Sequence, residues 1–183
     1  MKLIILDRDG VINQDSDHFV KSADEWMPIS GSIAAIARLS KAGFTVVVAT
    51  NQSGLGRGLF QPADLEAMHK KMHTMVKAAG GEIAAVVYCP HHPDENCDCR
   101  KPKAGLITQI EQQLTISAKG AITIGDSLRD LQAGLKKGCI PVLVKTGKGQ
   151  KTLQTIITEQ QPEFHNLAVY NDLAAAADAI IPS

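Results

Sequence analysis

Apolar residues, many of them β-branched, gather in five short runs that are separated by stretches with a helical spacing of apolar positions. Each run is too continuous for a strand with one face in water, which predicts central strands of a parallel sheet buried on both faces. The predicted strands cover residues 3–6, 44–49, 83–88, 121–124 and 140–144. The predicted helices between them cover residues 32–42, 62–79, 103–114 and 128–137.

The order of these elements predicts the class of the fold. Strands that alternate with helices of this length form βαβ units with right-handed crossovers, and such units build a doubly wound α/β sheet with helices on both faces. Beyond residue 150 the pattern is less regular, with a helix to residue 159, a short strand at 167–170 and an Ala-rich helix to residue 180. No internal repeat or linker divides the chain, so we expect a single domain over residues 1–183.

Acidic, hydroxyl and basic residues follow several of the predicted strands at their carboxyl ends. Asp7 and Asp9 come directly after the first strand, and their carboxylates face the same side because side chains alternate along an extended chain. Taken singly, positions of this kind are as typical of a solvated turn or a helix cap. Open α/β sheets, however, bind ligands at the carboxyl ends of their strands. The combination predicts one catalytic site there, formed by Asp7, Asp9, Thr50, Lys101, Asp126 and Asp130.

The segment at residues 89–99 concentrates three of the four cysteines of the chain beside two histidines. Cys89 is followed by His91 and His92, and Cys97 and Cys99 form a close C-x-C pair. Three thiols and one imidazole suit tetrahedral Zn²⁺, and four protein ligands leave no position for water. Without a metal, clustered thiols would be exposed to oxidation. We therefore predict a structural zinc-binding loop, in which spacing alone allows either histidine as the fourth ligand.

The bulk composition narrows the class of partner. The 183 residues contain 19 basic and 19 acidic side chains, so no net field attracts nucleic acid or an anionic membrane. No apolar run approaches the length of a membrane span, and the N-terminal run is too short for a secretory signal. We expect a cytoplasmic monomer with neither a nucleic-acid nor a membrane partner.

Four segments resemble the motifs of the haloacid dehalogenase superfamily. They are Asp7-Arg8-Asp9-Gly10, the apolar run into Thr50, Lys101 ahead of a predicted helix, and Gly125-Asp126 followed by Asp130. Within that superfamily, LDRDGVIN, TNQSGLGRG, CPHH to CDCRKP and GDSLRDLQAG are similar to the family of heptose bisphosphate phosphatases. The resemblance spans most of the chain and implies a haloacid dehalogenase-like sheet. Since no insertion here is long enough for the cap domain of many members, we expect no separate cap and an open site.

The resemblance implies hydrolysis of the 7-phosphate of D-glycero-D-manno-heptose 1,7-bisphosphate, a step in the synthesis of ADP-heptose for the lipopolysaccharide core. Asp7 would form an aspartyl-phosphate, and Asp9 would protonate the leaving sugar oxygen and later accept a proton from water. The pKa of Asp9 should therefore lie near the working pH. Thr50 and Lys101 would hold phosphate oxygens, and Asp130 would orient Lys101 or the metal shell.

Two metal ions follow from the same resemblance. Mg²⁺ prefers oxygen ligands, and the expected ones are the carboxylates of Asp7 and Asp126 with the backbone carbonyl of Asp9. For Zn²⁺, the resemblance selects His91 as the ligand beside Cys89, Cys97 and Cys99. Substrate specificity in the resembled family comes from short loops that contact the sugar and the second phosphate. The corresponding positions here are Asp15, Ser16, Asp17, His18, Asn51, Gln52, Ser53, Arg100 and Ser127.

Two other functions are open at this point. Histidinol-phosphate phosphatase shares the four motifs and has a zinc loop with this compact spacing, whereas the heptose enzymes usually show a longer stretch before the C-x-C pair. Asn51-Gln52-Ser53-Gly54 and Arg57-Gly58 favour the heptose family. A phospho-accepting receiver domain also combines acids, Thr and Lys on a doubly wound sheet, but it would need neither Asp9 nor the zinc loop.

Two further patterns are assigned no function. His69 and His73 lie four residues apart on a predicted helix, but the lysines between them and the lack of a carboxylate pattern favour a solvated face. Residues 145–148, Lys-Thr-Gly-Lys, do not match a phosphate-binding loop.

Overall fold

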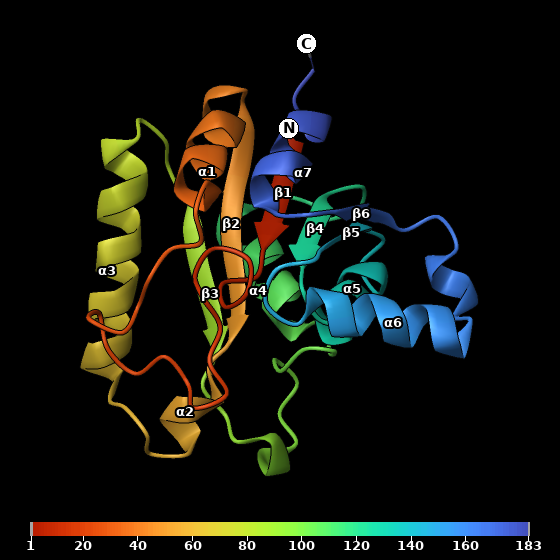
Figure 1. Ribbon diagram of the computed structural model, residues 1–183. Coiled ribbons are helices and arrows are strands. Elements are labelled where there is room, and N and C mark those ends of the chain that lie inside the picture. The colour runs from red at the N-terminus through yellow and green to blue at the C-terminus, as the bar shows by residue number, and fades with distance from the viewer. Residues whose placement is uncertain (1, 183) are drawn as a thin grey trace.

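The computed structural model describes residues 2–182 and contains a six-stranded sheet, in which β1, β2 and β3 point downward in Figure 1. The strand order is β3–β2–β1–β4–β5–β6, and every neighbouring pair is parallel. The strands are β1 (Lys2–Leu6), β2 (Phe44–Asn51), β3 (Ala85–Cys89), β4 (Ile122–Gly125), β5 (Ile140–Val144) and β6 (Ala168–Tyr170). The predicted doubly wound α/β class is confirmed, and each predicted strand is present with small shifts at its ends.

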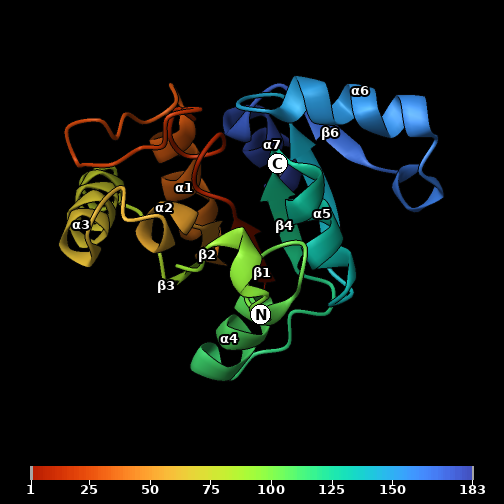
Figure 2. The same ribbon diagram turned by 90° about the horizontal axis from the view of Figure 1, so that it is seen from below.

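Helices cover both faces of the sheet, as the view from below shows (Figure 2). The long helices are α1 (Ser32–Lys41), α3 (Pro62–Ala78), α4 (Gly105–Leu114), α5 (Leu128–Leu135), α6 (Gly149–Glu159) and α7 (Leu173–Ile180). Three short elements were not predicted, namely α2 (Ser53–Gly56), η1 (Pro93–Glu95) and η2 (Pro162–Phe164). Elements of three or four residues are too short to show a period. None of the helices within residues 2–182 has the length and apolarity that crossing a membrane requires.

The core lies on both sides of the sheet, because successive strand residues point to opposite faces. Ile4 and Leu6 pack in one cluster with α1, α3 and α7, whereas Leu3 and Ile5 pack in a second cluster with α4. All four side chains are at most 4% exposed, and full burial of such a side chain contributes about 1.5–3 kcal/mol. Two buried faces explain why the apolar runs are continuous and do not alternate.

The order of the strands sets the place of the site. From β1 the chain winds through β2 to β3 on one side, and β4, β5 and β6 follow on the other side. Ligands bind at such a reversal, outside the carboxyl ends of the strands. Between β1 and α1 the described chain forms no helix or strand, only isolated bridges of Asn13 with Asp9 and Pro28. This short segment leaves the reversal point uncovered, as expected for a site without a cap.

Candidate active site

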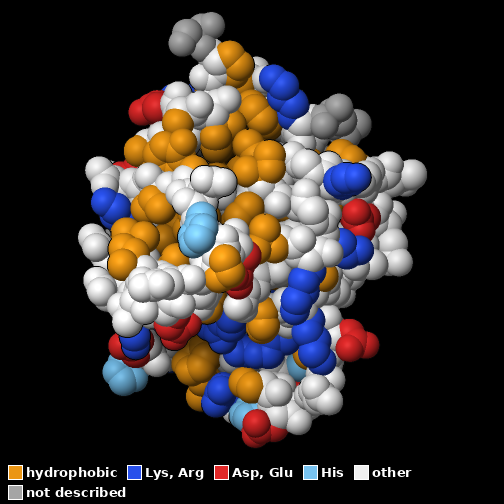
Figure 3. Space-filling model, turned by 90° about the vertical axis from the view of Figure 1, so that its right-hand side faces the viewer, with side chains coloured by type: hydrophobic (Ala, Val, Ile, Leu, Met, Phe, Trp, Pro, Cys, Tyr) orange, Lys and Arg blue, Asp and Glu red, His pale blue; other side chains and the backbone are white. Residues whose placement is uncertain are grey.

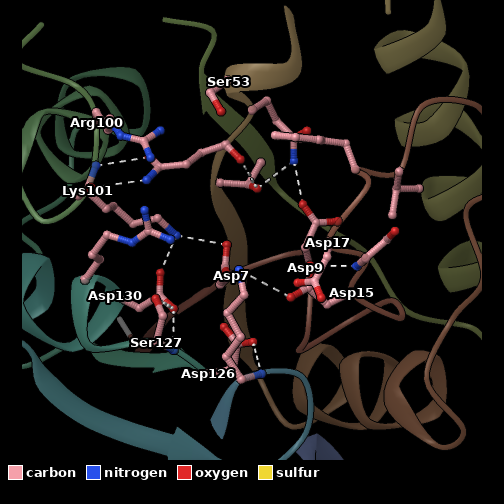
Figure 4. Close-up of a pocket in the computed structure, with 18 of the residues that line it drawn as sticks. Asp7, Asp9, Asp15, Asp17, Ser53, Arg100, Lys101, Asp126, Ser127 and Asp130 are labelled. Carbon is pink, nitrogen blue, oxygen red and sulfur yellow. Dashed lines mark hydrogen bonds and ion pairs between the residues drawn. The ribbon is translucent and has the colours of Figure 1, made fainter. Parts of the chain in front are cut away.

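A cavity of about 270 Å³ opens at the carboxyl end of the sheet (Figure 4). The predicted catalytic residues and magnesium ligands all line it: Asp7, Asp9, Thr50, Lys101 and Asp126. Most of the predicted substrate contacts line it too, namely Asp15, Ser16, Asp17, Asn51, Gln52, Ser53, Arg100 and Ser127.

His18 is the predicted substrate contact that does not line the cavity. The backbone turns here, with the His18 N–H donating to Ser16 Oγ and the next residue, Phe19, at a φ of 65°. The turn leaves the His18 side chain exposed and places Phe19 in the cavity wall instead. Sequence alone does not reveal such a reversal, because phenylalanine rarely adopts positive φ.

Asp7 lies directly beyond β1, at the centre of the cavity (Figure 4). The Lys101 ammonium is 2.9 Å from Asp7 Oδ1, 2.6 Å from Asp130 Oδ1 and 2.8 Å from the Ala49 carbonyl. All three of its donors are therefore used. Burial would lower the pKa of Lys101, but Asp130 and Asp7 raise it above its ordinary value, so the side chain stays charged. Of the two roles predicted for Asp130, the orientation of Lys101 agrees with these contacts.

Carboxylate oxygens of Asp7, Asp126 and Asp130 lie within 4.8 Å of one another. Burial, strengthened by the neighbouring carboxylates, raises the pKa of Asp7 to about 7 and that of Asp126 to about 8. Three acids around one ammonium leave buried negative charge that a divalent cation would neutralise. Because these donors are all hard oxygens, the group fits Mg²⁺.

Asp9 accepts hydrogen bonds on both carboxylate oxygens. Its Oδ1 accepts from Arg8 and Asn13, each at 2.8 Å, and its Oδ2 accepts from Gln52 at 2.9 Å. Burial alone would raise the pKa of Asp9, but the Arg8 charge and these hydrogen bonds hold it below its ordinary value. The predicted pKa near the working pH is therefore wrong for this arrangement, because the carboxylate is ionised at neutral pH.

The end of β2 supports Lys101. Asn51 Oδ1 accepts from the Lys101 backbone N–H at 3.0 Å, and Asn51 Nδ2 donates to the Lys101 carbonyl at 3.2 Å. Thr50 is buried, and its Oγ1 accepts from Gln52 at 2.9 Å and donates to the Asn51 carbonyl in a long contact of 3.4 Å, which the hydroxyl would give up to donate to a ligand oxygen. Asn51, predicted as a substrate contact, thus uses its amide group to position the lysine.

The loop at residues 145–148, between β5 and α6, also contributes to the site. The Lys148 backbone N–H donates to Asp126 Oδ2 at 2.8 Å, and its ammonium lies 3.5 Å from Asp15 Oδ2. Thr146 Oγ1 donates to the Gly10 carbonyl at 2.6 Å. The sequence alone indicated no function for this segment, yet it contacts Asp126 and the Gly10 carbonyl beside the cavity. Its position after a strand of the same sheet was the signal that could have identified it.

Three arginines line one part of the cavity, and two of them, Arg57 and Arg129, were not predicted. Burial and the charge of Arg129 lower the pKa of Arg100, whose Nη1 is buried without a partner. Among the described residues, no ion pair joins these three arginines to a carboxylate. Figure 3 shows Lys and Arg side chains gathered in the lower half of the molecule, at this end of the sheet. Such a cluster can bind an anionic group.

The thiols of Cys89, Cys97 and Cys99 converge, with Sγ atoms 2.8–3.6 Å apart. Although burial opposes it, hydrogen bonds from the Arg100 N–H and the neighbouring thiols lower the pKa of Cys97 to about 7. Sulfur ligands of tetrahedral Zn²⁺ stand about 3.8 Å apart, which is close to two of these separations, whereas Cys99 and Cys89 are only 2.8 Å apart. The three thiols could hold a metal ion such as Zn²⁺ once that pair moves apart. His91 is not brought to the group, because its Nδ1 lies 2.8 Å from Glu95 Oε2.

The fold and the site together are those of the haloacid dehalogenase class of phosphatases. The model of the family described as Polynucleotide kinase 3 phosphatase matches residues 2–138. D-glycero-β-D-manno-heptose-1,7-bisphosphate 7-phosphatase of Pseudomonas putida is 53% identical over 181 residues, which cover 99% of this chain and 100% of the relative. The chain therefore belongs to the family matched by that model and to the family of D-glycero-β-D-manno-heptose-1,7-bisphosphate 7-phosphatases.

Another relative and a solved structure agree with this membership. The enzyme of the same name from Neisseria meningitidis is 58% identical over 153 residues, covering 84% of this chain and 82% of the relative. The crystal structure of D,D-heptose 1,7-bisphosphate phosphatase from Bordetella bronchiseptica, complexed with magnesium and phosphate, has a TM-score of 0.91 at 53% identity and covers 98% of both chains. The protein is a phosphatase.

Proposed function

We propose that the protein hydrolyses the 7-phosphate of D-glycero-β-D-manno-heptose 1,7-bisphosphate through an aspartyl-phosphate on Asp7. One observation carries the proposal: a reacting centre around Asp7 and a separate group of arginines without ion-pair partners share one cavity. A substrate with two phosphates would occupy both parts. The names of the relatives supply the sugar and its anomer.

In the first step, Asp7 attacks phosphorus in line, so that an Asp7 oxygen–phosphorus bond forms while the bond from phosphorus to the sugar oxygen breaks. Lys101, fixed by Asp130 and the Ala49 carbonyl, offers positive charge beside the transferring phosphoryl group. The Thr50 hydroxyl donates to another phosphate oxygen. These groups are held before the substrate arrives, so little reorganisation opposes the reaction.

Asp9 moves the proton. In the first step it gives a proton to the departing sugar oxygen, and in the second step it takes one from the water whose oxygen displaces Asp7 from phosphorus. The first role requires the protonated acid, although the pKa of Asp9 is held low by Arg8 and its other hydrogen-bond donors. The negative charge of an arriving phosphate raises the pKa of a nearby carboxylate, which supports proton uptake as the substrate binds.

Mg²⁺ would be held by the carboxylates of Asp7 and Asp126 and by the Asp9 carbonyl. It supplies charge neutralisation between the anionic nucleophile and the phosphate. The N–H of Lys148 fixes one Asp126 oxygen, and the other oxygen accepts no hydrogen bond within the described residues. Zn²⁺ would be held by Cys89, Cys97, Cys99 and His91, once His91 gives up its contact with Glu95. It would stiffen the loop that precedes Arg100 and Lys101.

We also propose that residues 1–183 form one domain, with the zinc-binding loop at 89–99, and that the protein is a cytoplasmic monomer. One sheet supplies every strand of the described residues, which supports the single domain. Sedimentation equilibrium on the purified protein tests the oligomeric state, and a dimer mass would refute the monomer.

The substrate proposal is tested by phosphate release from a panel of esters. The heptose 1,7-bisphosphate in both anomers, a heptose 7-monophosphate, a hexose bisphosphate and histidinol phosphate are compared by kcat/KM. The β anomer of the heptose bisphosphate should be the best substrate. Preferred hydrolysis of histidinol phosphate would reject the assignment.

The covalent intermediate is tested separately with Asp7→Asn. The neutral amide cannot attack phosphorus, so turnover should be lost while the circular dichroism spectrum and the melting temperature stay close to those of the wild type. Acid quenching of the wild type with ³²P-labelled substrate should trap labelled protein, and Asp7→Asn should trap none. Near wild-type turnover by Asp7→Asn would show that another residue is the nucleophile.

A further inference from the structure

Arg8 stands between the two aspartates of the first motif, and its side chain is fully buried. Its Nε and Nη2 donate to Asp9 Oδ1 at 3.1 and 2.8 Å. Its Nη1 lies 3.3 Å from His69 Nε2 and 3.9 Å from Met68 Sδ, both on α3. A buried guanidinium thus connects helix α3 to the carboxylate of Asp9, although Arg8 takes part directly in neither step of the proposed reaction.

The His69 ring is a neutral acceptor for Arg8. Burial and the Arg8 charge lower the pKa of His69 to about 3, so at neutral pH one ring nitrogen accepts and the other carries hydrogen. Since a guanidinium can only donate, Nε2 is the accepting nitrogen. The ring also packs at a tilt against Tyr88 of β3, with centroids 6.1 Å apart. The predicted solvated face is therefore wrong for His69, whereas His73, one turn further along α3, is exposed.

The contacts on Asp9 are distributed unequally between its two oxygens. Arg8 and Asn13 both donate to Oδ1, while Gln52, which lines the cavity, donates to Oδ2. An arginine that served only as an ion-pair partner would gain most by bridging both oxygens. Here two guanidinium nitrogens donate to the same oxygen, and the other oxygen accepts only from Gln52, which lines the cavity.

We infer that Arg8 and His69 are positioning residues, which lock Asp9 Oδ1 toward α3 so that Oδ2 exchanges the proton with the substrate. The inference rests on the proposed acid–base role of Asp9 and adds what holds that carboxylate. Burying an arginine carries a large desolvation cost, which an apolar side chain of similar volume would avoid. A role in packing alone therefore does not explain the choice of residue.

The test compares two phosphate esters whose leaving groups differ in their need for an acid. A sugar oxygen must be protonated as it departs, whereas p-nitrophenolate leaves as a stable anion. Single-turnover rates of phosphoenzyme formation are measured on a sugar phosphate and on p-nitrophenyl phosphate. The variants are Arg8→Gln, His69→Leu, His69→Gln and Asp9→Asn, with His73→Leu as the exposed control on the same helix.

Arg8→Gln should lower the rate of phosphoenzyme formation by about a hundredfold with the sugar phosphate and by less than about threefold with p-nitrophenyl phosphate. This difference is expected when a general acid is misplaced. Asp9→Asn should show the same selectivity. His69→Leu should selectively lower the rate of phosphoenzyme formation from the sugar phosphate. His69→Gln should keep most of that rate, because its amide oxygen can accept from Arg8. His73→Leu should change the rate with neither ester.

Equal slowing of both esters by Arg8→Gln and His69→Leu would overturn the inference, since it would report a general loss of active enzyme. If Arg8→Gln does not fold, as circular dichroism would reveal, the two His69 variants decide. If Asp9→Asn itself lacks selectivity, the proposed acid role of Asp9 fails and the inference fails with it. Selectivity in Asp9→Asn alone would reject only the role of Arg8 and His69.

Discussion

Asp126 is a buried carboxylate and Asp7 a largely buried one, with oxygens within 4.8 Å of one another and of Asp130. Burial, and then repulsion among these acids, raises their pKa values to about 7 and about 8. Both must be ionised to hold a cation, so protons compete with Mg²⁺ below these values. The neutral pH range should therefore control the affinity of the site for the metal.

The affinity for Mg²⁺ should rise by about tenfold or more between about pH 6.5 and pH 8.5, since each proton displaced adds up to tenfold per pH unit. Binding should also release protons at the lower pH. Isothermal titration calorimetry in two buffers of different ionisation enthalpy measures both quantities. Asp126→Asn should weaken binding and reduce the proton release, and an affinity that is flat across this range would contradict the raised pKa values.

The sequence predicted residues whose role follows from their place after a strand. The rule that the carboxyl ends of parallel strands meet at one edge of the sheet was enough to predict that Asp7, Thr50 and Asp126 line one cavity. Arg8 was not found, because its role depends on His69, which only the folded chain brings to it. The wrong expectation for the pKa of Asp9 has a different cause, the hydrogen bonds of the Arg8 guanidinium to Asp9 Oδ1, because alternation along the strand did not predict that Arg8 turns back to its neighbour.

At the scale of elements, the loop between β5 and α6 carries a glycine that the site needs. Gly147 has a φ of +55°, and a Cβ there would collide with Asp126 Oδ2 and with the Gly10 backbone. The same loop holds Asp126 through the Lys148 N–H and binds the Gly10 carbonyl through Thr146. Any side chain at position 147 should therefore displace Asp126, a proposed magnesium ligand.

Gly147→Ala should lower the free energy of unfolding by about 1–3 kcal/mol and weaken Mg²⁺ binding by about tenfold or more, because left-handed strain adds to the displacement of Asp126. Gly43→Ala is the matched control, since Gly43 has a φ of +86° but open space around its Cβ position. Gly43→Ala should lower the free energy of unfolding through backbone strain and leave Mg²⁺ affinity unchanged. Chemical denaturation and calorimetry measure the two effects, and equal Mg²⁺ affinity in both variants would show that the loop does not hold Asp126.

The proposed zinc-binding loop at residues 89–99 can be tested by removing one of its thiols. Cys97→Ser should reduce bound zinc measured by mass spectrometry of the metal, because serine replaces one of the converging thiols. Activity should fall by about tenfold to a hundredfold, since the loop then holds Arg100 and Lys101 less firmly. Cys139→Ala is the control, as Cys139 is buried elsewhere and donates to the Ala118 carbonyl. A zinc-free preparation with full stability and activity would refute the structural role.

The long elements were predictable because a strand buried on both faces and a helix with one apolar face leave different periods in the sequence. The turn of η1 leaves no such mark. It includes Glu95, whose carboxylate contacts His91 Nδ1. This contact keeps the histidine away from the three converging thiols. Spacing predicts which ligands are near one another, whereas side-chain rotamers decide which of them meet.

At the scale of the whole molecule, a net charge of zero conceals an uneven distribution. Five basic side chains line the cavity, and three of them, Arg57, Arg100 and Arg129, have no carboxylate partner within the described structure. Composition could not show this, because these arginines come from three separate segments: Arg57 follows α2, Arg100 lies in the loop before α4, and Arg129 lies in the first turn of α5. The strand order, which brings those segments together, also depends on pairings between distant parts of the chain. A cavity lined in this way should distinguish substrates by their second anionic group.

Arg100→Ala should therefore separate bisphosphates from monophosphates. Loss of one charge-assisted contact to a phosphate costs about 1.5–3 kcal/mol, so kcat/KM for the heptose 1,7-bisphosphate should fall by about tenfold to a hundredfold. The 7-monophosphate should be hydrolysed at nearly the wild-type rate, because it lacks the group that Arg100 would hold. Initial rates of phosphate release on the two esters, with the same enzyme preparation, measure the difference.

The monophosphate serves as the internal control, and Arg38→Ala serves as the matched variant, because Arg38 pairs with Asp178 on the surface and does not line the cavity. Arg38→Ala should leave the ratio of the two rates unchanged. Equal losses on both esters in Arg100→Ala would mean that Arg100 serves the reacting phosphate beside Lys101. In that case Arg57 and Arg129 are the remaining candidates for the second phosphate, and their alanine variants should show the selective loss.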